Sequence, residues 1–227
     1  MEIVFRALEI TGLGLQVLLV FLLFGFLRQY TLLLIYALAA LGTAILEIYV
    51  SNHYGNDAPI FSTVYWSDEV LLDFLRFTIV IALAYKASAG SVTGPAVRKL
   101  LIGILLAAIL IPFLMPGAST FSLRWFNRSS QMLNFGGAVM NLVLWTVLLG
   151  NKRRDPRLLL VSVGVGISVT GAAIAWGVRL LTSREHWWAP NLFLILTYLA
   201  GVAVWCWAFR PGTQMAAHAG SGASGGV

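Results

Sequence analysis

The chain has 227 residues, of which 59% are hydrophobic and 11% are charged, and its formal net charge is +6. A soluble domain usually contains about 45–50% apolar and about 25% charged residues. Too few charged groups therefore remain to solvate a water-facing surface, and the membrane class is the only ordinary one that fits. The basic residues lie at the ends of apolar runs, which is a topological pattern and argues against nucleic acid as a partner.

Seven apolar runs are long enough to cross a bilayer, since about 20 residues span about 30 Å of hydrocarbon. In chain order they cover residues 10–27, 32–50, 70–85, 100–115, 132–150, 158–181 and 192–209. We therefore predict an all-α polytopic bundle of seven transmembrane helices that forms one domain over residues 1–210. The tail, residues 211–227, is rich in Gly, Ala and Ser without apolar periodicity, and we predict that it is disordered.

The third run is the least apolar of the seven because it contains Asp73 and Arg76. We expect Ser67, Asp68 and Glu69 to open this helix, with a capping hydroxyl and two carboxylates near its positive end. Glu69, Asp73 and Arg76 are then spaced i, i+4, i+7 on one helix face. The spacing i, i+3 also allows Asp73 to pair directly with Arg76.

Two further charges approach the same end of the bundle, Glu47 near the end of the second run and Arg179 near the end of the sixth. A lone charge in the membrane is costly, so each must face protein or a water-filled cavity. Two interpretations remain open for the set Glu47, Glu69, Asp73, Arg76 and Arg179. It forms either an outward-facing pocket for a ligand, ion or proton, or an ion-pair network that holds the second, third and sixth helices together.

Small residues with the spacing of close helix packing occur in the fifth and sixth runs. They are Gly136, Gly137, the pair Gly164 and Ser168, and the pair Gly166 and Thr170. We expect Asn141, in the fifth run, to donate an interhelical hydrogen bond beside them. In the fourth run, Pro112 is expected to kink the last helical turn.

The seventh run contains no lysine, so it offers no amine for a retinal Schiff base, and a rhodopsin-like function is rejected. Trp205 and Trp207 are expected to belong to the aromatic belt at a membrane interface. Cys206 lies between them and is expected to be a small buried hydrophobe.

The Lys and Arg residues divide unevenly between alternate connections. One side holds Arg28, Lys86, Arg98, Lys99, Lys152, Arg153, Arg154, Arg157 and Arg210, and the other holds Arg6, Arg124, Arg128 and Arg184. The positive-inside rule places the larger set in the cytoplasm, which predicts an N-terminus outside and a cytoplasmic C-terminus. The strongest basic anchor, which is also suited to anionic lipid or a cytoplasmic partner, is Lys152, Arg153, Arg154 and Arg157.

The stretch from Arg28 to Lys86 has an aromatic-rich outer loop that leads into an acidic helix start, Tyr65-Trp66-Ser67-Asp68-Glu69. In this it resembles a group of uncharacterised small bacterial membrane proteins. The hydropathy plan of residues 10–209 is also similar to the seven-helix sensor modules found before histidine kinase domains. The resemblance implies a sensor in a bacterial cytoplasmic (inner) membrane. No kinase or other output domain follows the last run, so a signalling role would require a separate partner chain.

No motif in the chain specifies a reaction, a cofactor or a substrate, and no set of side chains has metal-ligand spacing. We therefore expect no cofactor and no metal. Three functions remain open: a receptor-like sensor or scaffold subunit that acts through a protein partner or a second copy, a membrane enzyme acting on lipid, and a small transporter or channel subunit that uses Glu47, Asp73, Arg76 and Arg179. The polar residues are expected to stop in the outer half of the bilayer, which favours a pocket or a brace over a transport path.

Overall fold

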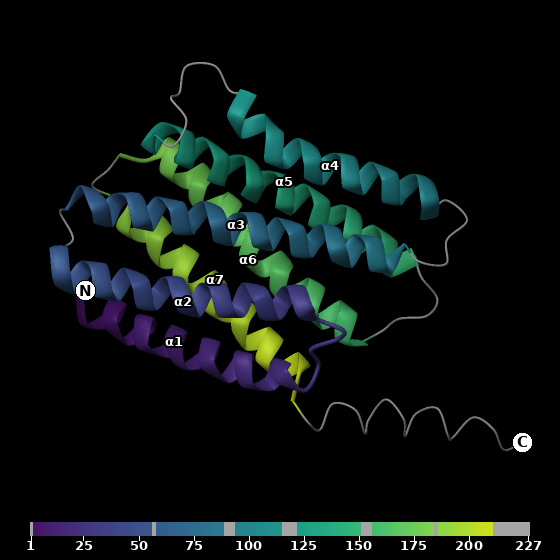
Figure 1. Cartoon of the computed structure of the whole chain (residues 1–227), viewed down its shortest axis with the longest axis horizontal. Helices are drawn as coiled ribbons and strands as arrows, with labels where there is room; N and C mark the ends of the chain where they lie inside the picture. The colour runs from purple at the N-terminus through teal and green to yellow at the C-terminus, as the bar shows by residue number, and fades with distance from the viewer. Residues whose placement is uncertain are drawn as a thin grey trace, which may run out of the picture.

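The computed structural model describes residues 2–55, 58–88, 94–114, 122–150, 156–183 and 186–210, and this part of the chain contains seven α-helices and no strand. They are α1 (Glu2–Phe24), α2 (Thr31–Tyr54), α3 (Pro59–Ala87), α4 (Gly94–Leu114), α5 (Leu123–Gly150), α6 (Pro156–Leu181) and α7 (Trp188–Ala208). The helices run side by side along the long axis of the molecule, and the chain begins and α7 ends at opposite ends of the bundle (Figure 1). The predicted all-α bundle is confirmed.

Six of the seven helices are long and apolar enough to cross a membrane, and α3 is the exception. Every 18-residue stretch of α3 contains at least three charged residues. This helix is nevertheless central, because it packs against α2, α4, α5 and α6. By contrast, α4 lies at the edge and exposes apolar side chains such as Leu106, Leu110 and Leu114. A bundle with mostly apolar helices of this kind is compatible with an integral membrane protein.

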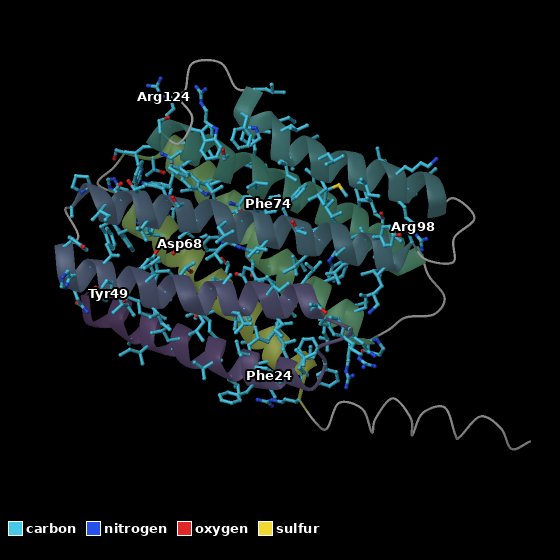
Figure 2. The ribbon with its side chains drawn as sticks, in the orientation of Figure 1. Phe24, Tyr49, Asp68, Phe74, Arg98 and Arg124 are labelled. Carbon is cyan, nitrogen blue, oxygen red and sulfur yellow. The ribbon has the colours of Figure 1, made fainter. Side chains whose placement is uncertain are left out.

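The helix α3 begins earlier than the sequence predicts. Pro59 occupies its first turn, where a missing N–H costs little. Ser67 lies two turns inside the helix, and its hydroxyl donates to the carbonyl oxygen of Thr63 at 2.7 Å. The prediction that Ser67 and its acidic neighbours open the helix is therefore wrong. Asp68 is instead an interior helical residue near the end of the bundle where the chain begins, opposite the end that carries Arg98 (Figure 2).

A seam of small residues joins α6 to α7. A Cβ atom on Gly164 would overlap the indole nitrogen of Trp205 and lie 2.9 Å from the carbonyl oxygen of Gly201. A Cβ on Gly201 would in turn overlap Ser168. The predicted packing role of Gly164 and Ser168 is therefore confirmed.

The other small residues of the sequence pattern have separate outcomes. Gly136 and Gly137 pack against Phe77 of α3, as predicted. Gly166 faces Asn141, since a Cβ there would lie 2.5 Å from the amide nitrogen, but Thr170 is exposed and takes no part in this packing.

The predicted place of Trp205 in an interfacial belt is wrong. Its side chain is fully buried, and its indole N–H donates to the carbonyl oxygen of Val161 at 3.0 Å. The ring also meets Tyr36 edge-on, with the ring centroids 5.6 Å apart. Trp207, two residues further on, is 58% exposed and suits a belt position. Cys206 is buried, as predicted.

Basic side chains gather at the end of the bundle where α1 and α7 finish. Three of them lie over aromatic rings at 4.5–4.9 Å from the centroid: Lys86 on Tyr30, Arg98 on Tyr85 and Arg157 on Phe26. Arg157 is the one member of the predicted basic anchor that the structure describes. The structure does not describe the other three members, Lys152, Arg153 and Arg154. Arg184 and the tail that we predict to be disordered also fall outside the described residues.

The indole of Trp125 ties α5 to the end of α4. In a regular helix the carbonyl oxygen of Pro112 would accept from the N–H of residue 116, but residue 116 is a proline and has no N–H. The indole N–H of Trp125 donates to this carbonyl oxygen at 2.7 Å. A side chain of the next helix thus supplies the hydrogen bond that Pro116, having no N–H, cannot donate.

Replacing Trp125 with Phe should lower the free energy of unfolding by about 1–3 kcal/mol, because the carbonyl oxygen of Pro112 loses its buried donor. Trp207→Phe, at an exposed tryptophan, is the matched control and should change little. The measurement is reversible unfolding of the purified chain in mixed micelles, followed by far-ultraviolet circular dichroism. Equal effects of the two substitutions would contradict the assignment.

Candidate functional site

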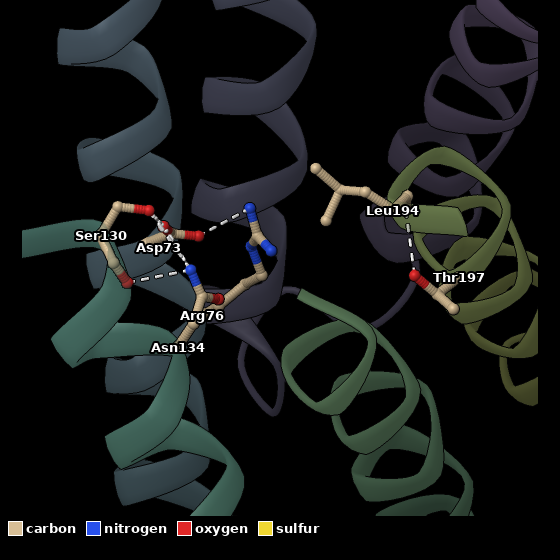
Figure 3. A network of polar contacts seen from close by, with 6 residues as sticks. All are labelled: Asp73, Arg76, Ser130, Asn134, Leu194 and Thr197. Atoms are coloured by element: carbon tan, nitrogen blue, oxygen red, sulfur yellow. Dashed lines mark hydrogen bonds and ion pairs between the residues drawn. The ribbon is translucent and has the colours of Figure 1, made fainter. Parts of the chain in front are cut away.

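A buried polar cluster lies between α3 and α5, centred on the carboxylate of Asp73 (Figure 3). One carboxylate oxygen is 2.9 Å from an Nη atom of Arg76, so the predicted i, i+3 pair is present. The other oxygen accepts hydrogen bonds from the hydroxyl of Ser130 and from the amide of Asn134, the latter at 2.6 Å. All four side chains are at least nine-tenths buried.

The two partners on α5 are held in place by their own helix. Ser130 and Asn134 are spaced i, i+4 and share a face, and the Asn134 amide also donates to the carbonyl oxygen of Ser130 at 3.0 Å. The absence of side chains at Gly136 and Gly137 lets α5 approach Phe77 closely, which brings this face onto Asp73. Charge-assisted hydrogen bonds of this kind offset the cost of removing the ion pair from water. The cluster thus clamps α3 to α5, not to α6 as the brace interpretation expects.

A second group of polar side chains continues from Arg76 away from α5. The guanidinium lies within electrostatic range of the hydroxyls of Tyr36 on α2 and Tyr198 on α7, and these two hydroxyls lie near each other. Among the described residues, neither the Tyr36 hydroxyl nor the Nε atom of Arg76 has a hydrogen-bond partner. The amide of Gln16 on α1 donates to the Tyr198 oxygen at 2.5 Å. We call this series of side chains the polar chain: Gln16, Tyr198, Tyr36, Arg76, Asp73, Ser130 and Asn134. It brings together side chains from five helices in the interior of the bundle. Hydrogen bonds join Gln16 to Tyr198 and Asp73 to its partners on α5, whereas Tyr36 is linked to its neighbours by proximity alone.

A cavity of about 780 Å³ opens beside the first members of the polar chain, between α1, α2 and α7. It lies toward the end of the bundle where the chain begins, and we call it the α1–α2–α7 cavity. Gln16 and Tyr198 form part of its wall. Its remaining lining is mixed, with Glu9, Glu47, Ser51 and Asn52 among the polar residues, and Leu8, Leu13, Ile48, Phe61, Ile195 and Leu199 among the apolar ones.

Glu47 does not approach Arg76, although the sequence suggests it as a partner. Its carboxyl group lies close to the carboxyl of Asp68, which is also close to the hydroxyl of Thr43. Two carboxyl groups from neighbouring helices thus face each other at the edge of the cavity. Such a pair is stable only when a proton or another cation lies between the two groups or close to them.

The two other members of the predicted charged set have different surroundings. Glu69 lies within electrostatic range of Asp73, Arg76 and Arg179. Arg179 donates twice to the side-chain oxygen of Asn191 on α7, at 2.5 and 3.0 Å, and its guanidinium lies 4.6 Å from the ring centroid of Trp176. It therefore links α6 to α7, while Asp73 and Arg76 form the direct ion pair.

Sequence reasoning missed the other members of the polar chain and the partner of Glu47. They are Gln16, Tyr36, Asp68 as the partner of Glu47, Ser130, Asn134 and Tyr198. A usable signal exists for one pair, because Ser130 and Asn134 place two polar side chains one helical turn apart beside an apolar run. For Tyr36 and Tyr198, the sequence does not show whether the hydroxyl lies inside the bundle or at the membrane interface.

Polar contacts between helices become rare toward the opposite end of the bundle. The described core there consists mainly of apolar side chains such as Leu33, Val80, Leu83, Leu144 and Val161. Two hydroxyls outside the polar chain bond within their own helices: the buried Ser168 donates to Gly164, and the half-buried Thr197 donates to Leu194 (Figure 3). In the described residues the polar chain stops before it reaches the far end.

Within the described residues, no group of three or more His, Cys, Asp or Glu side chains is arranged to hold a metal ion. Comparison of the chain with protein-family models, curated proteins and solved structures finds no match. The site is therefore interpreted from its own geometry.

Proposed function

We propose that this chain is a receptor-like sensor in a bacterial cytoplasmic membrane. In this proposal all seven helices cross the bilayer, the N-terminus lies outside and the C-terminus lies in the cytoplasm. A small molecule enters the α1–α2–α7 cavity from the outer side. Its presence alters the polar chain, and a separate partner chain, or a second copy of this one, responds to the change.

One observation carries the proposal: Gln16 and Tyr198 belong both to the wall of the cavity and to the polar chain. A ligand that contacts either side chain acts on a series of polar groups that reaches α5. Because buried polar groups are costly when they lose a partner, a small displacement at one end favours a rearrangement further along. The volume of the cavity also falls within the range of about 300–1,000 Å³ that small-molecule sites occupy.

In this proposal α3 is the seventh membrane-crossing helix, although its own residues are too polar to meet the apolarity expected of a transmembrane helix. Asp73 and Arg76 neutralise each other and are enclosed by α2, α5 and α7, so neither charge faces lipid. Intramembrane charges that are paired and face the bundle interior are the kind that membrane proteins tolerate. The exposed apolar faces of the surrounding helices would then contact the lipid chains.

Transport is the weaker alternative, because a transport path needs polar groups on both sides of the midplane. The apolar far half of the core favours a closed-ended pocket. If the chain did transport its ligand, leucine-lined segments around Val80 and Val161 would have to separate in each cycle.

The test is native mass spectrometry of the full chain, purified from its own membranes in a mild detergent. We expect wild type to retain a bound small molecule, and Leu13→Trp, which fills the cavity, to lose it. Leu32→Trp is the matched control, because Leu32 lines a separate cleft of about 180 Å³ near the opposite end. An identical set of bound molecules in wild type and Leu13→Trp would overturn the proposal.

A further inference from the structure

We infer that the ligand of the α1–α2–α7 cavity is a small organic amine, held at its ammonium group by Glu47 and Gln16 and along its apolar body by α7. This inference rests on the proposed function, since it names the ligand class of the same cavity. Three independent features of the cavity support it: its charge, an unpaired acceptor and its apolar wall.

The charge of the cavity favours a cation. Two of its lining residues are acidic, Glu9 and Glu47, and among the lining residues that the structure describes none is basic. Glu47 has three acidic electrostatic neighbours, Asp68, Glu69 and Glu9. Like charges repel strongly where the surroundings are poorly polar, so this region is stabilised by a proton on one of the carboxyl groups or by a cation that enters.

The nearest described cations are already engaged elsewhere. Arg76 pairs with Asp73, and Arg179 donates both of its hydrogen bonds to Asn191. Neither side chain lines the cavity. Both arginines lie within electrostatic range of Glu69, but no described contact bonds either of them to Glu47 or Glu9. An ammonium group in the cavity would add a positive charge beside these two carboxyl groups.

Gln16, whose side chain lines the cavity, has a buried amide oxygen without a donor, and a ligand N–H matches such an acceptor. Gln16 is only 8% exposed, and its amide nitrogen is used by Tyr198. Its amide oxygen is buried and has no hydrogen-bond partner in the described structure. A buried acceptor without a donor is costly, so a ligand N–H that reaches this oxygen gains affinity. A primary ammonium can donate both here and to Glu47, whereas a quaternary ammonium can donate to neither.

The apolar wall of the cavity accommodates the body of such a molecule. Leu13, Ile195 and Leu199 line it from α1 and α7, and Phe61 adds an aromatic ring from α3. Ligand sites of this kind combine mostly apolar walls with a few polar groups that fix orientation. A single amine head with a hydrocarbon or aromatic body matches this division.

The test uses three probes of similar shape on the full chain in detergent, with titration calorimetry at pH 7: 2-phenylethylamine, 2-phenylethanol and 3-phenylpropanoate. We expect the amine to bind at least about 10-fold more tightly than the other two, since about 1.4 kcal/mol of added interaction gives that factor. Glu47→Gln should remove most of this preference and leave binding of the alcohol unchanged. Gln16→Leu should weaken binding of the amine and have a smaller effect on a fourth probe, N,N,N-trimethyl-2-phenylethylammonium, which has no N–H.

Two matched control substitutions are at positions that do not line the α1–α2–α7 cavity. Asp155→Asn, in the connection between α5 and α6, removes a carboxylate, and Gln29→Leu, in the separate cleft, removes an amide. Both should leave amine binding unchanged. Equal affinity for amine and alcohol in wild type, or tighter binding of the carboxylate, would overturn the inference about the ligand class.

The outcomes also separate this inference from the proposed function. If none of the probes binds while Leu13→Trp still releases a native molecule, the amine is the wrong class and the cavity remains a ligand site. If no probe binds and Leu13→Trp has no effect, both proposals fall. The comparison of probes in wild type needs no variant, so a substitution that impairs folding cannot hide the result.

Discussion

Replacing Asp73 with Ala is expected to destabilise the bundle by about 3–5 kcal/mol, because it leaves the buried guanidinium of Arg76 without its counter-charge. Ser130 and Asn134 would lose their common acceptor at the same time. Reversible unfolding in mixed micelles measures the change. Arg124→Gln, at an exposed arginine near the start of α5, is the control and should fall within about 0.5 kcal/mol of wild type.

The double variant Asp73→Asn with Arg76→Gln tests whether Asp73 and Arg76 matter because they pair with each other or because one of the two charges is needed by itself. Both charges are removed, and the amide oxygen at position 73 can still accept from Ser130 and Asn134. We expect the double variant to recover much of the stability and folded yield that Asp73→Asn or Arg76→Gln loses alone. If the double variant is as unstable as the sum of the two singles, the pair does not act as a unit.

Gly164→Ala is expected to lower the free energy of unfolding by about 1–3 kcal/mol, since the added methyl group would push α7 away from α6. The nearest obstacles are the Trp205 indole and the backbone carbonyl of Gly201, and a backbone atom cannot turn aside. Unfolding of the variant in mixed micelles gives the size of the effect.

Gly177→Ala is the matched control on the same helix, because a Cβ atom there would meet nothing within 4 Å. Alanine has the higher helix propensity by about 1 kcal/mol, so this variant should be neutral or slightly more stable. Similar losses in both variants would mean that the α6–α7 seam is not the reason for the effect.

The class of the helices and six of the seven runs could be predicted directly from length and apolarity, whereas α3 is too polar for these two criteria alone. The helix starts could not. The first turns of α3 and α5, around Pro59 and Leu123, precede the apolar runs and mix apolar with polar residues. Hydropathy does not show where a helix extends beyond an apolar stretch. This shortfall removed Ser130 from the predicted fifth helix and therefore from the predicted site.

The site was predictable only where its contacts are local. Asp73 and Arg76 lie three residues apart on one helix, so their pairing follows from helix geometry alone. The partners from α5, α2 and α7 depend on which helices are neighbours and how each is rotated. The error at Trp205 has the same origin. A tryptophan near the end of an apolar run looks the same in the sequence whether its ring points into the bundle or toward a membrane interface.

The central claim is that occupation of the α1–α2–α7 cavity is felt at α5 through the polar chain. Its most direct test is amide hydrogen exchange of the full chain in nanodiscs, with and without saturating 2-phenylethylamine, in wild type and Tyr198→Phe. We expect the probe to slow exchange around Ser130 and Asn134 in wild type, and Tyr198→Phe to bind the probe with that distant protection lost. Protection confined to α1, α2 and α7 in wild type would contradict the claim.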